Sequence, residues 1–180
     1  KLKILDISNN NIQSLPPSIG QLASLENLNL ENNLISSLPE SIKGWTSIKQ
    51  LNLNVNRIKK LPPEIGQLTT LEQFGLNRNI IDQLPPEIGQ LSNLKTLTLS
   101  GNKLTSVPPE LGNLLNLQVL GLNSNYIKAI PATLTQLTKL HTFSLSNNTI
   151  SNKEQFLTIQ SKLYALKNYY PPEYKKQFNN

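Results

Sequence analysis

A leucine or isoleucine recurs every 23 residues along most of this 180-residue chain. A fixed period of roughly 20 to 50 residues is typical of a solenoid, in which one supersecondary unit stacks on copies of itself. We therefore expect seven stacked coils. The recurring residues are Leu2, Leu25, Ile48, Leu71, Leu94, Leu117 and Leu140.

The first half of each unit has the pattern of a strand. We count positions within a unit from its recurring first residue. Positions 4 and 6 are apolar and alternate with polar residues, as Leu28 and Leu30 do, which predicts a strand with one buried face. Position 11 is apolar again, for example at Ile35.

Position 9 is asparagine in every unit. An unpaired buried amide costs roughly 1–3 kcal/mol, so we expect each of these amides to bond backbone groups of its own turn and of the next coil. The asparagines are Asn10, Asn33, Asn56, Asn79, Asn102, Asn125 and Asn148.

The second half of each unit is the return path. Position 15 is proline in the first six units, from Pro16 to Pro131, and proline cannot continue a strand ladder or a helix interior. We expect polyproline-like backbone there, or a single helical turn that begins after the proline. Strands are wider than tight turns, so the stack should curve with the strands on its concave side.

These residues together resemble the leucine-rich repeat, LxxLxLxxNxI/LxxLPxxI/LxxLxx, over residues 2–150. The LPxEIGxL return half is similar to the class found in small bacterial leucine-rich repeat proteins, Ras-binding scaffolds and the repeat arm of Roco-type GTPases. The resemblance implies an α/β solenoid: a curved horseshoe with a parallel concave sheet, short helical turns and polyproline-like segments outside, and a protein-binding role without chemistry.

The sequence divides into seven repeats at 1–151 and a different segment at 152–180. Within 152–168, Phe156, Ile159, Leu163 and Leu166 have helical spacing, which predicts a capping helix over the last coil. That helix would cover Leu140, Phe143 and Leu145. The remaining tail, with Pro171 and Pro172, could complete the cap or form an exposed binding peptide.

Composition limits the context. The chain has no cysteine, and no apolar run approaches the length of a membrane span. Cysteine-capped extracellular repeat proteins are therefore a poor match, and a cytoplasmic protein or a bacterial secreted or surface protein remains open. The net charge of +6 is too thinly spread for nucleic-acid binding, which favours a denser basic stripe with aromatic residues.

No catalytic constellation is visible. The one histidine, His141, has no cysteine or acidic cluster near it in the pattern. We therefore expect a protein that is not an enzyme, with no cofactor and no metal.

The outward strand positions 3, 5 and 7 should form the concave surface. They carry mostly amides and hydroxyls, which fits a polar groove for a partner, or equally strand positions filled by repeat duplication. From this face we predict partner-binding residues at Asn29, Glu31, Asn52, Asn54 and Asn77.

The adjacent rim, at positions 8 and 10, departs more sharply from the repeat. Here Leu34, Val55, Ile80 and Tyr126 are apolar where sister units are polar or charged, and Arg57 and Arg78 lie among them. Exposed apolar residues framed by arginine predict a partner patch, although scattered surface apolar residues are also normal.

The sequence therefore indicates a non-catalytic module that binds a protein or peptide on its concave face and rim. Two alternatives stay open: the regulatory arm of a larger GTPase or kinase, or a bacterial secreted or surface factor that binds a host protein. The uncovered first coil could also associate edge to edge with another copy.

Overall fold

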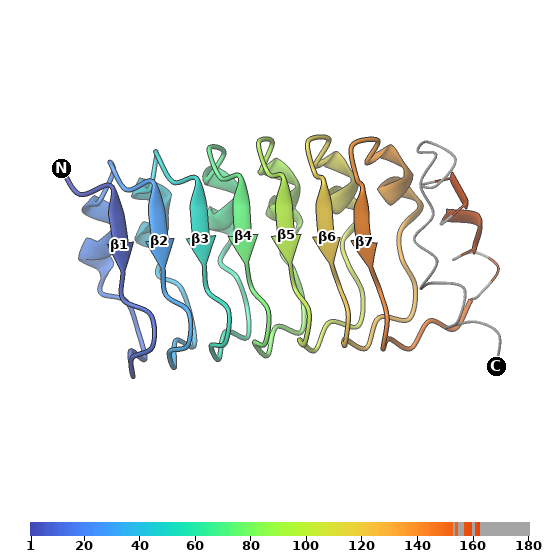
Figure 1. Cartoon of the computed structure of the whole chain (residues 1–180), viewed down its shortest axis with the longest axis horizontal. Coiled ribbons are helices and arrows are strands. Elements are labelled where there is room, and N and C mark those ends of the chain that lie inside the picture. Colours follow the sequence, from blue (N-terminus) through green and yellow to red (C-terminus); the bar gives the residue numbers. More distant parts are fainter. Residues whose placement is uncertain (153, 155–156, 160, 163–180) are drawn as a thin grey trace.

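The computed structural model describes residues 1–152, 154, 157–159 and 161–162. Seven three-residue strands form one parallel sheet in the order β1-β2-β3-β4-β5-β6-β7, and Figure 1 shows them side by side along the stack. The strands are β1 Ile4–Asp6, β2 Asn27–Asn29, β3 Gln50–Asn52, β4 Gln73–Gly75, β5 Thr96–Thr98, β6 Val119–Gly121 and β7 Thr142–Ser144.

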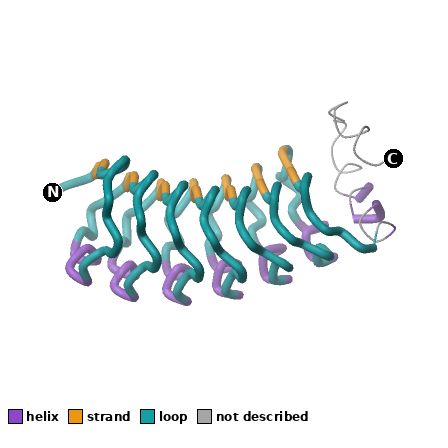
Figure 2. Tube along the Cα trace, turned by 90° about the horizontal axis from the view of Figure 1, so that it is seen from below, coloured by secondary structure: helices purple, strands orange, loops and turns teal. Residues whose placement is uncertain are grey.

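Each return path contains one short 3₁₀ helix. Each of these helices begins directly after the position-15 proline, which confirms the predicted single helical turn. Figure 2 shows the strands along the inside of the curve and the helices outside it. The helices are η1 Pro17–Gln21, η2 Glu40–Gly44, η3 Pro63–Gln67, η4 Pro86–Gln90, η5 Pro109–Asn113 and η6 Ala132–Gln136.

The strands pair in strict register, because each residue lies beside the residue 23 positions further along. Leu28, for example, pairs with Leu51, and Asn29 pairs with Asn52. Every repeat position therefore forms a column that runs the length of the stack. The core consists of such columns, including position 4 from Leu28 to Leu120 and position 6 from Leu30 to Leu122, all essentially inaccessible to water.

Trp45 replaces a core leucine on the return path of the second coil, where the neighbouring coils carry Leu22 and Leu68, and it is fully buried. Its indole N–H donates to the Ile19 carbonyl of the preceding coil at 2.9 Å. A buried indole needs such an acceptor, so the larger ring is accommodated without an unpaired donor.

The asparagine column ties neighbouring coils together. Asn79 Nδ2 donates to the Leu53 carbonyl of the preceding coil at 2.9 Å and to the Leu76 carbonyl of its own turn at 3.2 Å. Its Oδ1 accepts from the Ile58 N–H of the preceding coil at 2.9 Å. The inter-coil partner is thus the preceding coil, where the sequence analysis had expected the next one.

The C-terminal segment is helical at residues 154, 157–159 and 161–162. Ile159 is buried and belongs to the same hydrophobic core as Leu140 and Leu145. The predicted cap residues Phe156, Leu163 and Leu166, and the tail after them, lie outside the described residues.

We predict that Asn79→Ala lowers the free energy of unfolding by roughly 3 kcal/mol or more, because several buried backbone groups lose partners worth about 1–3 kcal/mol each. Urea or thermal unfolding measures this change. Asn10→Ala is the matched control: among the described residues the side chain of exposed Asn10 bonds only the Ile7 and Ser8 carbonyls of its own turn, so a smaller loss is expected. Equal losses in the two variants would contradict the inter-coil role.

Candidate interaction surface

The strands display a groove of about 400 Å³ on the concave face, along β1 to β5. Gln50 and Gln73 line it as exposed side chains, Thr96 and Thr98 follow in the next coil, and Asp6 supplies a carboxylate at one end. The surface can therefore offer hydrogen bonds to an extended or irregular partner. Among the described residues no cluster of three or more His, Cys, Asp or Glu side chains could hold a metal ion.

The concave asparagines predicted as binding residues are already engaged by their own scaffold. Asn29 donates to Asp6 Oδ2 at 3.0 Å and accepts from the Glu31 N–H at 3.2 Å. Asn52 donates to Glu31 Oε2 at 3.0 Å and accepts from the Asn54 N–H at 3.1 Å. Asp6, Asn29, Glu31 and Asn52 therefore form a hydrogen-bonded row across the first three coils, in which the Glu31 backbone N–H connects the Asp6–Asn29 pair to the Glu31–Asn52 pair.

In the fourth and fifth coils the backbone N–H of position 7 has a different acceptor. Position 5 becomes Gly75, which has no side chain to cap the Asn77 N–H, and Asn54 Oδ1 of the preceding coil accepts it at 2.7 Å. Asn77 Oδ1 likewise accepts from the Ser100 N–H at 2.8 Å. The side-chain oxygens of Asn54 and Asn77 therefore support the turns, and within the described residues their Nδ2 groups remain available as donors.

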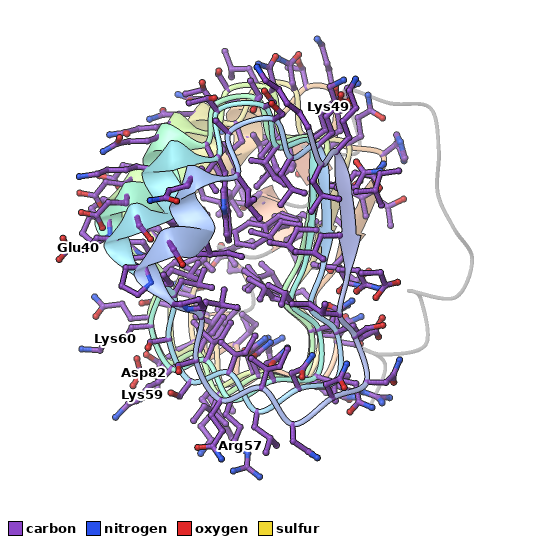
Figure 3. The ribbon with its side chains drawn as sticks, turned by 90° about the vertical axis from the view of Figure 1, so that its left-hand side faces the viewer. Glu40, Lys49, Arg57, Lys59, Lys60 and Asp82 are labelled. Carbon is purple, nitrogen blue, oxygen red and sulfur yellow. The ribbon has the colours of Figure 1, made fainter. Side chains whose placement is uncertain are left out.

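The two rims of the sheet differ in charge. Figure 3 views the stack along its axis and places Lys49 toward one end of the strands and Arg57 beyond the opposite end. On the Lys49 side, position 2 alternates in sign through the first five coils. The residues of this column are Lys3, Glu26, Lys49, Glu72 and Lys95.

Ion pairs within this column offset most of its charge. Glu26 lies between Lys3 at 2.7 Å and Lys49 at 2.9 Å, and Glu72 contacts Lys95 at 2.6 Å. Hydrogen bonds from Lys3 and Lys49, supported by their charges, lower the pKa of Glu26 to about 2. These ion pairs could have been predicted from the sequence by comparing the charges at position 2 in successive units.

The opposite rim, at positions 8 and 10, has no such neutralisation. Arg57, Arg78 and Lys103 are exposed, and none of them forms an ion pair with another described residue. This rim therefore carries positive charge that the described structure leaves uncompensated.

The predicted apolar residues of this rim are brought into two neighbouring columns. Ile80 and Tyr126 are 39% and 56% exposed, whereas Leu34 and Val55 are only half-buried, so the exposed apolar surface is smaller than the sequence suggested. Leu115 is equally exposed but lies away from these columns, directly after η5.

Val55 has an unusual backbone. Its φ is 56°, in the left-handed region where a β-branched residue is a genuine outlier. Two inter-coil hydrogen bonds hold it there: the Val55 N–H donates to Asn77 O at 2.8 Å, and Val55 O accepts from the Asn33 N–H at 3.2 Å. Position 8 is left-handed in all seven coils, and most of the other coils place Asn, Ser or Gly there. That preference was a signal the sequence analysis missed.

Comparison with known proteins identifies the family. The leucine rich repeat model matches residues 1–58 and 92–150. The chain belongs to the leucine-rich repeat family. No curated protein matches.

Solved leucine-rich repeat structures agree. The Leptospira interrogans LRR protein LIC12759 is 36% identical with a TM-score of 0.83, over 89% of this chain and 41% of that one. The plant peptide hormone receptor RGFR1 in complex with RGF2 is 30% identical with a TM-score of 0.76, over 83% of this chain and 25% of the receptor. The PEPR1–AtPEP1 structure is 28% identical with a TM-score of 0.75, over 81% and 21%. This chain therefore spans less than half the length of each.

No helix among the described residues is long and apolar enough to cross a membrane. The leucine-rich repeat neighbours and the polar groove together support a role in molecular interaction.

We predict that Val55→Asn raises the free energy of unfolding, by up to about 1–2 kcal/mol, because asparagine tolerates the left-handed region far better than valine. The reciprocal change Asn32→Val, at the same position one coil earlier, should lower stability. Denaturant unfolding of both variants measures the pair. Unchanged or reduced stability of Val55→Asn would mean that the valine is not strained.

Proposed function

We propose that this chain is a non-catalytic interaction module that binds a protein or peptide partner on its concave face and on the rim of positions 8 and 10. The observation that carries the proposal is the composition of this rim. Exposed Ile80 lies in the same coil as Arg78 and one coil from Arg57, and exposed Tyr126 lies one coil from Lys103. Val55 lies on the same rim although its backbone conformation is unfavourable. Strain and exposed apolar surface oppose stability, so their coincidence favours a binding role.

The groove and the rim have different tasks in this proposal. The concave amides and hydroxyls supply hydrogen bonds but lack the aromatic and arginine anchors that dominate tight interfaces. The rim supplies both kinds of anchor, in Tyr126 and the two arginines. The plant peptide hormone receptor RGFR1 in complex with RGF2 and the PEPR1–AtPEP1 structure support the proposal, since both are similar in fold to this chain.

The context of the module is also a proposal. Similarity to the Leptospira protein favours a bacterial protein, either a secreted or surface factor that binds a host protein or an intracellular binding module. Since the chain covers less than half of each compared structure, it could equally serve as the regulatory arm of a larger signalling protein.

Affinity capture from native lysate tests the binding surface. We predict that combining Arg57→Glu, Arg78→Glu and Ile80→Asp lowers recovery of a captured partner by at least about tenfold, because charge and an apolar anchor are lost together. The midpoint of thermal unfolding should stay nearly unchanged, because all three side chains are exposed.

A second variant separates the groove from the rim. Gln50→Arg with Gln73→Arg fills the groove at two exposed side chains that make no hydrogen bond among the described residues, and it should also reduce capture. Full capture by both variants would reject the proposed function.

We also propose that this chain can associate edge to edge through β1. Among the described residues the strand pairs only with β2, and Ile4 within the strand and Leu2 before it are 65% and 48% exposed. An uncovered strand with apolar neighbours can pair with a second copy. We predict an apparent mass that rises with concentration in light scattering and falls back to the monomer in Ile4→Lys. A concentration-independent monomer mass rejects this association.

A further inference from the structure

In coils two to six, the position-10 column of the rim alternates between apolar and cationic residues, while the first and seventh coils carry Asn11 and Thr149 at this position. Arg57 and Lys103 are cationic and lie between the apolar residues of the coils on either side. All five are held in register by their own backbone, because each N–H donates to position 11 of the preceding coil at 2.8–3.1 Å. The five residues, from coil two to coil six, are Leu34, Arg57, Ile80, Lys103 and Tyr126.

The opposite rim shows why this alternation points to a partner. There, the alternating residues of position 2 are opposite in charge and satisfy one another along the stack. Apolar and cationic side chains cannot satisfy one another in this way. Separating two cations by a neutral residue would reduce their repulsion, but any polar residue would achieve that, and the coils concerned carry Leu, Ile and Tyr.

The spacing of the column favours a helix as the partner. Neighbouring coils lie about 4.8 Å apart, so apolar residues recur roughly every 10 Å. On an α-helix, residues i and i+7 lie about 10.5 Å apart, and residue i+4 lies about 6 Å from i on the same face. An extended strand repeats one face every ~6.7 Å and matches neither spacing.

We propose that this rim binds an acidic amphipathic helix laid along the stack, with apolar residues at i, i+7 and i+14 and carboxylates at i+4 and i+11. The apolar residues would contact Leu34, Ile80 and Tyr126, and the carboxylates would pair with Arg57 and Lys103. This inference rests on the proposed function and names the class of partner for the rim.

The test uses two synthetic peptides of about 18 residues, five helical turns, in an alanine-rich background. One carries Leu at i, i+7 and i+14 with Glu at i+4 and i+11. Its isomer has the same composition but places Glu at i+2 and i+9, on the opposite face. Circular dichroism verifies that the two are equally helical, and nuclear magnetic resonance titration of the labelled chain measures binding.

The same-face peptide should bind at least about tenfold more tightly than its isomer, with the largest amide shifts along the position-10 column. Arg57→Glu with Lys103→Glu should weaken this binding by at least about tenfold, and raising the salt concentration should weaken it as well. The matched control is Lys43→Glu with Lys60→Glu: it makes the same charge change at exposed residues outside the column, neither of which forms an ion pair among the described residues, and should have little effect.

Equal binding of the two peptides, or no effect of the Arg57 and Lys103 reversal, would overturn the inference. Binding of duplex DNA or phosphatidylglycerol vesicles to this column without binding of the peptide would also overturn it, in favour of another class of partner. If no peptide binds but partner capture still depends on the rim or groove variants, the inference fails and the proposed function stands. The proposed function is rejected by a separate result, namely partner capture that neither the rim variant nor the groove variant reduces.

Discussion

The asparagine at position 9 is the interaction on which the rest of this structure depends. In coils two to six its side chain is almost fully buried, bonding its own turn and two backbone groups of the coil before it. Apolar packing alone is not directional and would tolerate some sliding of coils. The amide has fixed donor and acceptor directions, so it selects one register and turns every repeat position into a straight column.

The columns explain how a repetitive chain acquires a specific surface. At position 2, ion pairs along the column offset most of the charge, and Glu26 lies between two lysines. At position 8 the backbone is left-handed, and its N–H and carbonyl continue the inter-coil hydrogen bonds beyond the end of the strand. This conformation has a steric cost at Val55. At position 10, the cationic side chains form no ion pair with another described residue, and apolar side chains are exposed to solvent. The packing of the fold does not account for the residue types at this position.

The 23-residue period predicted the parallel strands, the turn after each proline and the buried leucine columns, because those features depend on residues within one unit. It did not predict the direction of the Asn79 bonds, the left-handed backbone at Val55 or the support that Asn54 gives to the next turn. The Asn79 bonds and the Asn54 support depend on which coil lies beside which. The left-handed backbone was indicated by the Asn, Ser and Gly residues that most other coils carry at position 8. The identity of a partner lies beyond both kinds of information, since only the complementary surface of that partner defines it.

Amide hydrogen exchange tests the register claim most directly. The N–H groups of Ile35, Ile58, Ile81 and Leu104 each donate to an asparagine Oδ1 of the following coil at 2.9–3.0 Å. If these bonds fix the stack, the four amides exchange only on global unfolding, as slowly as the most protected strand amides. Rapid exchange at these four positions while the strand amides stay protected would show that the asparagine column does not hold the coils in register.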